Sequence, residues 1–256
     1  MIEPTTTASE PTPSASKPAI PRTVALIGNP NVGKTTLFNT LAGRRQKTAN
    51  FPGTTQDAHI ATIETPAGET TLVDLPGIYS LSLDQSESVI CRGVLEGNTA
   101  PEGWRARPPE AVMLVLDGTN LLRNLRLAGE VLARRLPSVV VVSMADAASR
   151  RGIHIDADRL EALLGVPVVV VSSKTKQGVN EILPTLARAR ASEFEFPADA
   201  AALELWADGV YADVASSHDE RDEDDRLTDR FDRAFTHPVV GVVLFAAIMT
   251  GLFWVI

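Results

Sequence analysis

Short apolar runs recur along this chain, and segments of helical periodicity separate them. The runs at 111–116, 139–142 and 168–171 contain no polar residue, which is typical of strands covered on both faces of a sheet. The stretch at 59–63 alternates like a strand, and a Pro-Ala-Gly turn joins it to 70–73 as a hairpin. The pattern predicts an α/β domain with a mostly parallel six-stranded sheet and helices on both faces. The expected strands are 24–27, 59–63, 70–73, 111–116, 139–142 and 168–171.

Helical periodicity is found at 86–95, 121–136 and 156–164, with Asp156 as the N-cap of the last segment. These segments alternate with the strands, so the connecting loops fall at the ends of the strands. Ligands of such sheets bind at the carboxyl ends of the strands. We therefore expect the functional residues to lie at that edge.

The first strand runs directly into a Gly-rich loop that opens a helix through Leu37, Phe38 and Leu41. This order of strand, loop, Gly-Lys-Thr and helix is that of a phosphate cradle, in which backbone N–H groups and the positive helix end bind an anion. Lys34 would bring its charge to the outer phosphates, and the Thr35 hydroxyl is placed to bind Mg²⁺. A plain turn before a helix does not explain Lys-Thr at this offset. The predicted cradle is Gly28, Asn29, Pro30, Asn31, Val32, Gly33, Lys34, Thr35 and Thr36.

A second motif, Asp-Leu-Pro-Gly at 74–77, follows one hairpin later. Asp74 at the end of its strand can hold Mg²⁺ through the metal's water shell, and the Gly77 N–H can face the terminal phosphate. Alone this motif is weak, because ordinary turns use both residue types. Its position one hairpin after Gly-Lys-Thr makes it a strong indication of nucleotide binding.

A threonine between the two motifs should close over the metal. Thr54 and Thr55 are both available, and Thr55 is the preferred ligand, through its hydroxyl or its carbonyl. The alternative is a threonine that only shapes a turn. Under the functional interpretation the γ-phosphate orders both segments, which is a switch mechanism.

Asp146 follows the valine run at 139–142 and predicts guanine recognition. Its carboxylate can accept from the ring N–H and amino group of guanine, whereas adenine would leave the charge unpaired. Ser172, Ser173 and Lys174 would supply a backbone N–H to the guanine carbonyl. The usual pattern is Asn-Lys-x-Asp, and Ser143 and Met144 replace its first two residues here. We therefore expect GTP over ATP, with weaker affinity or softer discrimination than the full motif gives.

The residue after Gly77 is Ile78, an aliphatic side chain that cannot orient water. Small G proteins of the Ras type place a glutamine at this position. The sequence therefore predicts a slow GTPase. Another group must position the water or supply positive charge.

The two ends of the chain differ in composition from the middle. The first residues are rich in Ser, Thr and Pro, which predicts disorder, and they lack the apolar core of a secretory signal. From residue 238 onward there is no charge, and Trp254 suits a membrane interface, although a buried C-terminal helix is the alternative. The chain stops where the span would finish, so we expect a fragment of a longer membrane protein. The predicted organisation is a disordered tail at 1–21, a GTPase domain at 22–190, a helical or acidic subdomain or linker at 191–235, and the start of a transmembrane helix at 236–256.

Charge and side-chain chemistry narrow the function further. The net charge of −8 argues against a nucleic-acid partner. The acidic run at 218–225 is interpreted as a solvated face or linker, with cation binding as the alternative. The four histidines show no ligand spacing, and the single cysteine, Cys91, fits a reducing compartment and a buried position in a helix.

With these residues in hand, the chain resembles the ferrous iron transport protein B (FeoB) family. The resemblance covers about 23–186 and resumes from 229. The segments that carry it are Gly-Asn-Pro-Asn-Val-Gly-Lys-Thr-Thr-Leu-Phe-Asn at 28–39, Asn-Phe-Pro-Gly-Thr-Thr at 50–55, Val-Asp-Leu-Pro-Gly-Ile-Tyr-Ser-Leu at 73–81, and the stretches 117–125, 152–156 and 232–241.

The resemblance implies a cytoplasmic GTPase domain that precedes a polytopic transport domain in the bacterial inner membrane. Fe²⁺ would be transported elsewhere in the full chain, with GTP turnover driving or gating it. The implied catalytic residues are Lys34, Asn31, Thr55 and Gly77, with Asn31 holding an activating K⁺ that supplies the missing positive charge. The lipid membrane is an implied partner, and a homo-oligomer stays open.

This sequence departs from the family in two places. Ser143 stands where the family has Asn, and the region between 186 and 229 is shorter and more acidic than the helical subdomain usually found there. Two alternatives therefore stay open. One is a regulatory GTPase of the ribosome-assembly or RNA-modification type with a membrane tail, which should carry a basic region that this chain lacks. The other is a nucleotide sensor that does not hydrolyse GTP.

Overall fold

The computed structural model of the chain describes residues 20–43, 46–54, 56–65, 68–102, 104–172 and 175–217, together with 250, 251 and 254. Several of the predicted features lie outside the described residues. They are residues 1–19 of the N-terminal tail, Thr55, Ser173, Lys174, the acidic run at 218–225 and nearly all of the predicted membrane helix.

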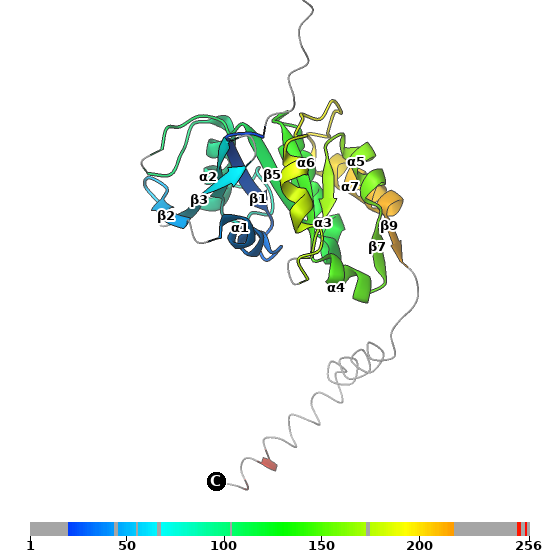
Figure 1. Cartoon of the computed structure of the whole chain (residues 1–256). Coiled ribbons are helices and arrows are strands. Elements are labelled where there is room, and N and C mark those ends of the chain that lie inside the picture. The colour runs from blue at the N-terminus through cyan, green and yellow to red at the C-terminus, as the bar shows by residue number, and fades with distance from the viewer. Residues whose placement is uncertain are drawn as a thin grey trace, which may run out of the picture.

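A mostly parallel seven-stranded sheet forms the centre of the molecule, in the order β2-β3-β4-β1-β5-β6-β8 (Figure 1). Strands β4, β1, β5, β6 and β8 pair in parallel, and β2 and β3 are antiparallel to their neighbours. The predicted α/β class is therefore confirmed. The strands are β1 (Thr23–Gly28), β2 (Gln46–Asn50), β3 (Asp57–Thr65), β4 (Gly68–Asp74), β5 (Ala111–Asp117), β6 (Ser138–Ser143) and β8 (Val168–Val170).

The strand count corrects the prediction of six. The additional strand, β2, pairs with β3 from Gln46 opposite Ala61 to Asn50 opposite Asp57. It forms the outer edge of the sheet, and four of its five residues are exposed. A strand with neither face buried carries no apolar alternation, so the hydrophobic pattern did not reveal it.

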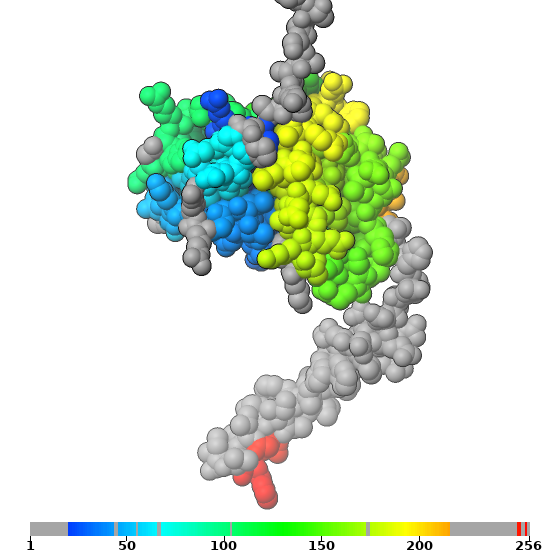
Figure 2. All heavy atoms as spheres, viewed as in Figure 1, coloured from blue at the N-terminus to red at the C-terminus, as the bar shows by residue number. Residues whose placement is uncertain are grey.

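Helices cover both faces of the sheet. One apolar cluster joins β-strand side chains to α2, α3, α5 and α7, and a second cluster joins them to α1 and α6. Figure 2 shows the second face, where the yellow α6 region lies between the blue α1 region and the green segments around α4 and α5. The helices are α1 (Lys34–Ala42), α2 (Ser86–Glu96), α3 (Leu121–Leu132), α4 (Ala145–Arg150), α5 (Ala157–Leu164), α6 (Ile182–Leu186) and α7 (Ala200–Val214), with short 3-10 turns at η1 (Gly118–Asn120) and η2 (Val179–Glu181).

The predicted helix boundaries agree closely with the structure at α2 and α5. Asp156 caps α5, because its Oδ1 accepts from the backbone N–H of Arg159 at 2.9 Å. Helix α3 ends at Leu132 rather than at 136, and Arg135 just beyond it has a positive φ of 56°. A left-handed residue is incompatible with a continuing helix, so the chain turns there toward β6.

The described part of the predicted 191–235 segment packs on the same core as the sheet. Helix α7 lies against α3 and α5 and buries Ala207, Val210 and Val214. Beyond it, β9 (Ala215–Ser217) pairs antiparallel with β7 (Ile153–Ile155). Within the part of the chain that the structure describes, no helix has the length and apolarity needed to cross a membrane.

Candidate nucleotide-binding site

The predicted cradle connects β1 to α1 at the carboxyl edge of the sheet. A cavity of about 470 Å³ opens at this edge. Its lining brings together residues from the cradle, from the second motif and from the end of β6. They are Asn29, Pro30, Asn31, Gly33, Lys34, Thr35, Thr36, Gly77 and Met144.

Lys34, Thr35 and Asp74 meet beside this cavity, although the two motifs lie about 40 residues apart in sequence. The Lys34 ammonium forms an ion pair with Asp74 and also donates to the Leu75 carbonyl. The Thr35 hydroxyl donates to Asp74 Oδ2 at 3.1 Å. Lys34 and Asp74 are 8% and 3% exposed, so each charge is buried and depends on the other.

The Asp-Leu-Pro-Gly segment lies directly against the cradle. The backbone N–H of Leu75 donates to Leu26 O at 3.0 Å, and that of Ile78 donates to Gly28 O at 3.2 Å. A Cβ on Gly77 would lie 3.0 Å from the Cα of Pro30, so this close approach favours glycine. The Ile78 side chain points the other way, into the core, and is 3% exposed.

Two cradle asparagines have different surroundings. Asn29 is 3% exposed, and neither atom of its side-chain amide finds a hydrogen-bond partner among the described residues. Asn31 is exposed at the cavity and adopts a left-handed backbone with φ of 64°. Asn31 lines the cavity, and its role in binding a cation stays a prediction.

Ser143 lies behind the cradle, at the end of β6, and is almost fully buried. Its Oγ is 2.6 Å from Val32 O and 3.0 Å from Leu116 O, and with one hydrogen it donates to one carbonyl at a time. The hydroxyl thus ties the cradle to β5 and β6. Ser143 supports the cradle through these buried hydrogen bonds and does not line the cavity, whereas Met144 does.

Asp146 and Ser172 come together from the ends of β6 and β8. Ser172 Oγ donates to Asp146 Oδ1 at 2.8 Å, and Arg150 contacts Oδ2 at 3.0 Å. The hydrogen bond from Ser172, and then that from Arg150, hold the pKa of the Asp146 carboxyl below its usual value of 3.8. Guanine recognition by this carboxylate stays a prediction. Residues 173 and 174 lie outside the described set.

The threonine segment before β3 forms a turn. Thr54 Oγ1 donates to Phe51 O at 3.1 Å and accepts from the Gln56 N–H at 3.2 Å. Gln56 in turn donates from Nε2 to Glu87 Oε1 of α2 at 2.8 Å, which links the threonine segment to the beginning of α2. Thr54 therefore shapes a turn, and Thr55 stays a prediction outside the described residues.

Sequence reasoning missed the contacts that hold the segment after Gly77 to α3. Glu130 accepts from the Ser80 hydroxyl at 2.7 Å and from the Leu81 N–H. Arg123 of the same helix lies 4.2 Å from the ring centroid of Tyr79. These contacts join residues about 50 positions apart and belong to no motif, so only the fold reveals them.

The mostly parallel sheet, the phosphate cradle with its lysine, and the carboxylates at the ends of β4 and β6 define a P-loop nucleotide-binding domain of the G-protein class. The sequence profile described as ferrous iron transport protein B matches residues 22–186, so the chain belongs to that family.

Two curated relatives show how much of the family's length this chain represents. It is 37% identical over 176 residues to the Fe(2+) transporter FeoB of Escherichia coli K12 and 36% identical over 176 residues to that of Salmonella typhimurium LT2. Each match covers 67% of this chain but 22% of the relative. The chain therefore corresponds to about a fifth of those proteins.

Solved structures of FeoB domains are similar to this chain in fold. The G domain of T. maritima FeoB is 34% identical, with a TM-score of 0.56 over 64% of this chain and 95% of that one. A GDP-bound mutant of S. thermophilus NFeoB is 34% identical, with a TM-score of 0.60 over 68% of this chain and 64% of that one.

Proposed function

We propose that this chain binds GTP with Mg²⁺ and hydrolyses GTP, as the cytoplasmic domain of a bacterial inner-membrane Fe(II) transporter. The observation that carries the proposal is the convergence of Lys34, Thr35 and Asp74 at the phosphate cradle. The GDP-bound FeoB relative supports a guanine nucleotide at this position. Fe(II) is the cargo of the whole transporter, and this domain gates or drives its passage.

The donor set fits a magnesium ion. The Thr35 hydroxyl and the Asp74 carboxylate lie within hydrogen-bond distance of each other, and Mg²⁺ prefers such oxygen ligands. Thr35, Asp74 and Thr55 are the residues that would hold it. When bound, the metal supplies positive charge to the β- and γ-phosphates.

The other residues bind and orient the nucleotide. Lys34 exchanges its carboxylate partner for the outer phosphates, and the Gly77 N–H donates to the γ-phosphate, where charge changes during transfer. Asp146, oriented by Ser172, accepts from guanine. The segments around Thr55 and Gly77 act as switches, because the γ-phosphate orders both.

Hydrolysis is slow in this proposal, because the buried Ile78 side chain cannot orient a water molecule. Asn31 compensates by holding K⁺ beside the phosphates. The same buried Ile78 favours a second candidate, a sensor that binds GTP without hydrolysing it. The net charge of −8 favours neither RNA nor the ribosome as a partner.

A hydrolysis assay tests the proposal. We expect the chain to hydrolyse GTP with Mg²⁺ faster in KCl than in NaCl, and Asn31→Ala to abolish the difference while GDP still binds. Equal rates in both salts would exclude the potassium role. GTP binding without hydrolysis in either salt would favour the sensor.

A further inference from the structure

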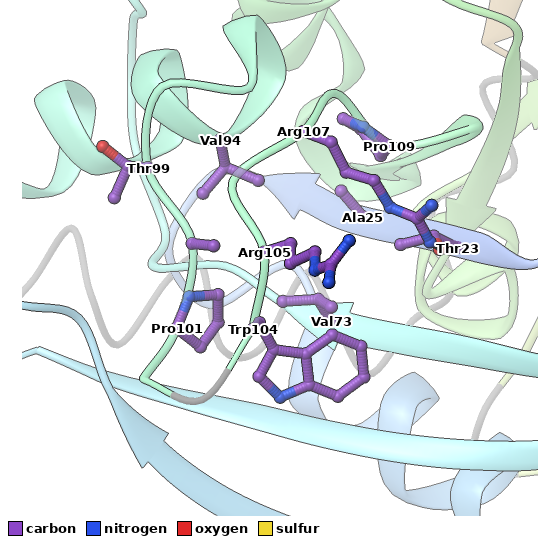
Figure 3. A pocket seen from close by; sticks show the side chains of 11 residues that line it. Thr23, Ala25, Val73, Val94, Thr99, Pro101, Trp104, Arg105, Arg107 and Pro109 are labelled. Carbon is purple, nitrogen blue, oxygen red and sulfur yellow. Dashed lines mark hydrogen bonds between the residues drawn. The ribbon is translucent and has the colours of Figure 1, made fainter.

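A second pocket, of about 390 Å³, lies on the α2 side of the sheet, beneath the loop that connects α2 to β5. Ligand pockets in proteins commonly have volumes of this order, from about 300 Å³ upward. Figure 3 shows the labelled loop residues arranged around the strand residues Ala25 and Val73. Its apolar wall is formed by Ala25, Val73, Val94, Ala100, Pro101 and Pro109.

Two arginines border this apolar space. Figure 3 shows the guanidinium groups of Arg105 and Arg107 on the same side of the pocket. Arg107 donates to Thr23 Oγ1 at 3.3 Å, and Arg105 has no hydrogen-bond or ion-pair partner among the described residues. None of the lining residues is acidic, although the chain as a whole carries a net charge of −8.

The two arginines favour a negatively charged ligand in this pocket. Arg105 and Arg107 are both exposed, and two guanidinium groups on the same side of an apolar pocket favour an anionic group beside them. A carboxylate matches the guanidinium fork through two parallel hydrogen bonds. A phosphate group has a third oxygen, and the apolar wall provides no hydrogen-bond donor for it. A carboxylate therefore fits this pocket better than a phosphate.

Residues in and beside the pocket are connected to both predicted switch segments, the one at 50–55 and the one at 74–77. Val73 directly precedes Asp74, and Val94 belongs to α2, which follows the Asp-Leu-Pro-Gly segment. The loop above the pocket is tied to the other segment, because the Glu102 N–H donates to Asn50 O at 2.9 Å. An occupant would therefore contact residues joined to both segments.

We propose that this pocket is a binding site for a small apolar carboxylate. The apolar body of the ligand packs against Val73 and Val94, the Trp104 indole covers its outer side, and its carboxylate binds Arg105 and Arg107. The site is separate from the phosphate cradle, so the proposal does not rest on nucleotide binding.

Titration calorimetry with 4-phenylbutanoate on the full chain tests this site, with 4-phenylbutan-1-ol as the uncharged analogue. We expect saturable binding of the acid, and binding of the alcohol weaker by roughly tenfold, as expected for one lost charge-assisted hydrogen bond. Arg105→Gln should weaken the acid by a similar factor. Arg151→Gln, an exposed arginine of the α4 region, is the matched control and should leave the affinity unchanged.

Two further measurements locate the ligand. Methyl NMR signals of Val73 and Val94 should shift on titration, and Ala100→Trp, which fills the pocket, should abolish binding while thermal unfolding shows a folded protein. Three results would overturn the proposal: no saturable binding, equal affinity for the acid and the alcohol, or an Arg105→Gln affinity equal to that of the wild type.

Discussion

Lys34 and Asp74 form a buried ion pair, and the proposed function assigns both residues to nucleotide binding as well. Removing one partner leaves the other charge buried without compensation. We expect Asp74→Ala to lower the free energy of unfolding by about 3–5 kcal/mol, measured by urea denaturation. It should also abolish Mg²⁺-dependent GTP binding.

The double variant Lys34→Met with Asp74→Leu is the control for this prediction. It replaces the pair by apolar side chains, so it should recover most of the lost stability and still fail to bind nucleotide. If Asp74→Ala were as stable as the wild type, the Lys34 charge would not depend on Asp74.

Ser143 is the second residue with a specific expected effect. Ser143→Ala leaves the Val32 and Leu116 carbonyls without their hydroxyl donor, so the cradle loses a brace. We expect GDP to bind roughly fivefold more weakly, which corresponds to about 1 kcal/mol for one hydrogen bond. Fluorescence titration with a labelled GDP measures it.

Ser192→Ala is the matched control, because Ser192 is also buried and donates to Leu164 O at 2.7 Å, outside the cradle. It should cost stability without changing the affinity for GDP. Equal loss of affinity in both variants would contradict the bracing role of Ser143.

For single residues, the positions of Lys34, Thr35 and Asp74 in the sequence were enough to predict that they lie close together. Each of them follows or ends a strand of a parallel sheet, and such strand ends meet at one edge. The position of Ser143 could not be predicted in the same way. Its partner Val32 lies 111 residues earlier, and a serine at the end of a strand is equally consistent with facing the nucleotide. Nor does the sequence predict that the Asn29 amide is buried with no hydrogen-bond partner among the residues that the structure describes.

Among the elements, α3 holds the segment that follows Gly77. Glu130→Gln removes a charged acceptor from the Ser80 hydroxyl and the Leu81 N–H. We expect hydrogen exchange at Leu81 to become roughly tenfold faster, since one charge-assisted hydrogen bond is weakened. NMR-detected exchange measures it residue by residue.

Glu204→Gln provides the comparison, because Glu204 also contacts α3, through Arg126, but at an exposed pair. It should leave the Leu81 exchange rate unchanged. Unchanged exchange in Glu130→Gln as well would show that α3 does not hold this segment.

The elements that the sequence predicted well are the buried ones. The apolar runs that form β5, β6 and β8 carry a strong signal, and Asp156 marks the beginning of α5. The exposed edge strand β2 and the three-residue strands β7 and β9 were missed. Short or exposed strands depend on pairing with a neighbour rather than on their own pattern.

On the scale of the whole molecule, α7 extends the core of the nucleotide-binding domain. A Cβ on Gly129 of α3 would lie 2.5 Å from Leu203 Cδ1 and 3.1 Å from the Trp206 ring. We expect Gly129→Leu to separate α7 from α3 and to lower the free energy of unfolding by about 1–3 kcal/mol. Urea denaturation monitored by circular dichroism measures the change.

Gly209→Leu is the matched control, since Gly209 lies in α7 with open space around its Cα. It should stabilise the protein by up to about 1 kcal/mol, because leucine is the better helix former. Stabilisation of the same size by Gly129→Leu would contradict the close packing of α3 and α7.

The central claim is that a guanine nucleotide with its magnesium ion binds at the Lys34 cradle. Calorimetric titration of the full chain with GTP and with ATP, each with Mg²⁺, tests it most directly. We predict saturable GTP binding and at least roughly tenfold weaker ATP binding, because adenine cannot donate to the Asp146 carboxylate from both a ring N–H and an amino group, as guanine can. Absence of GTP binding, or equal affinity for the two nucleotides, would contradict the account.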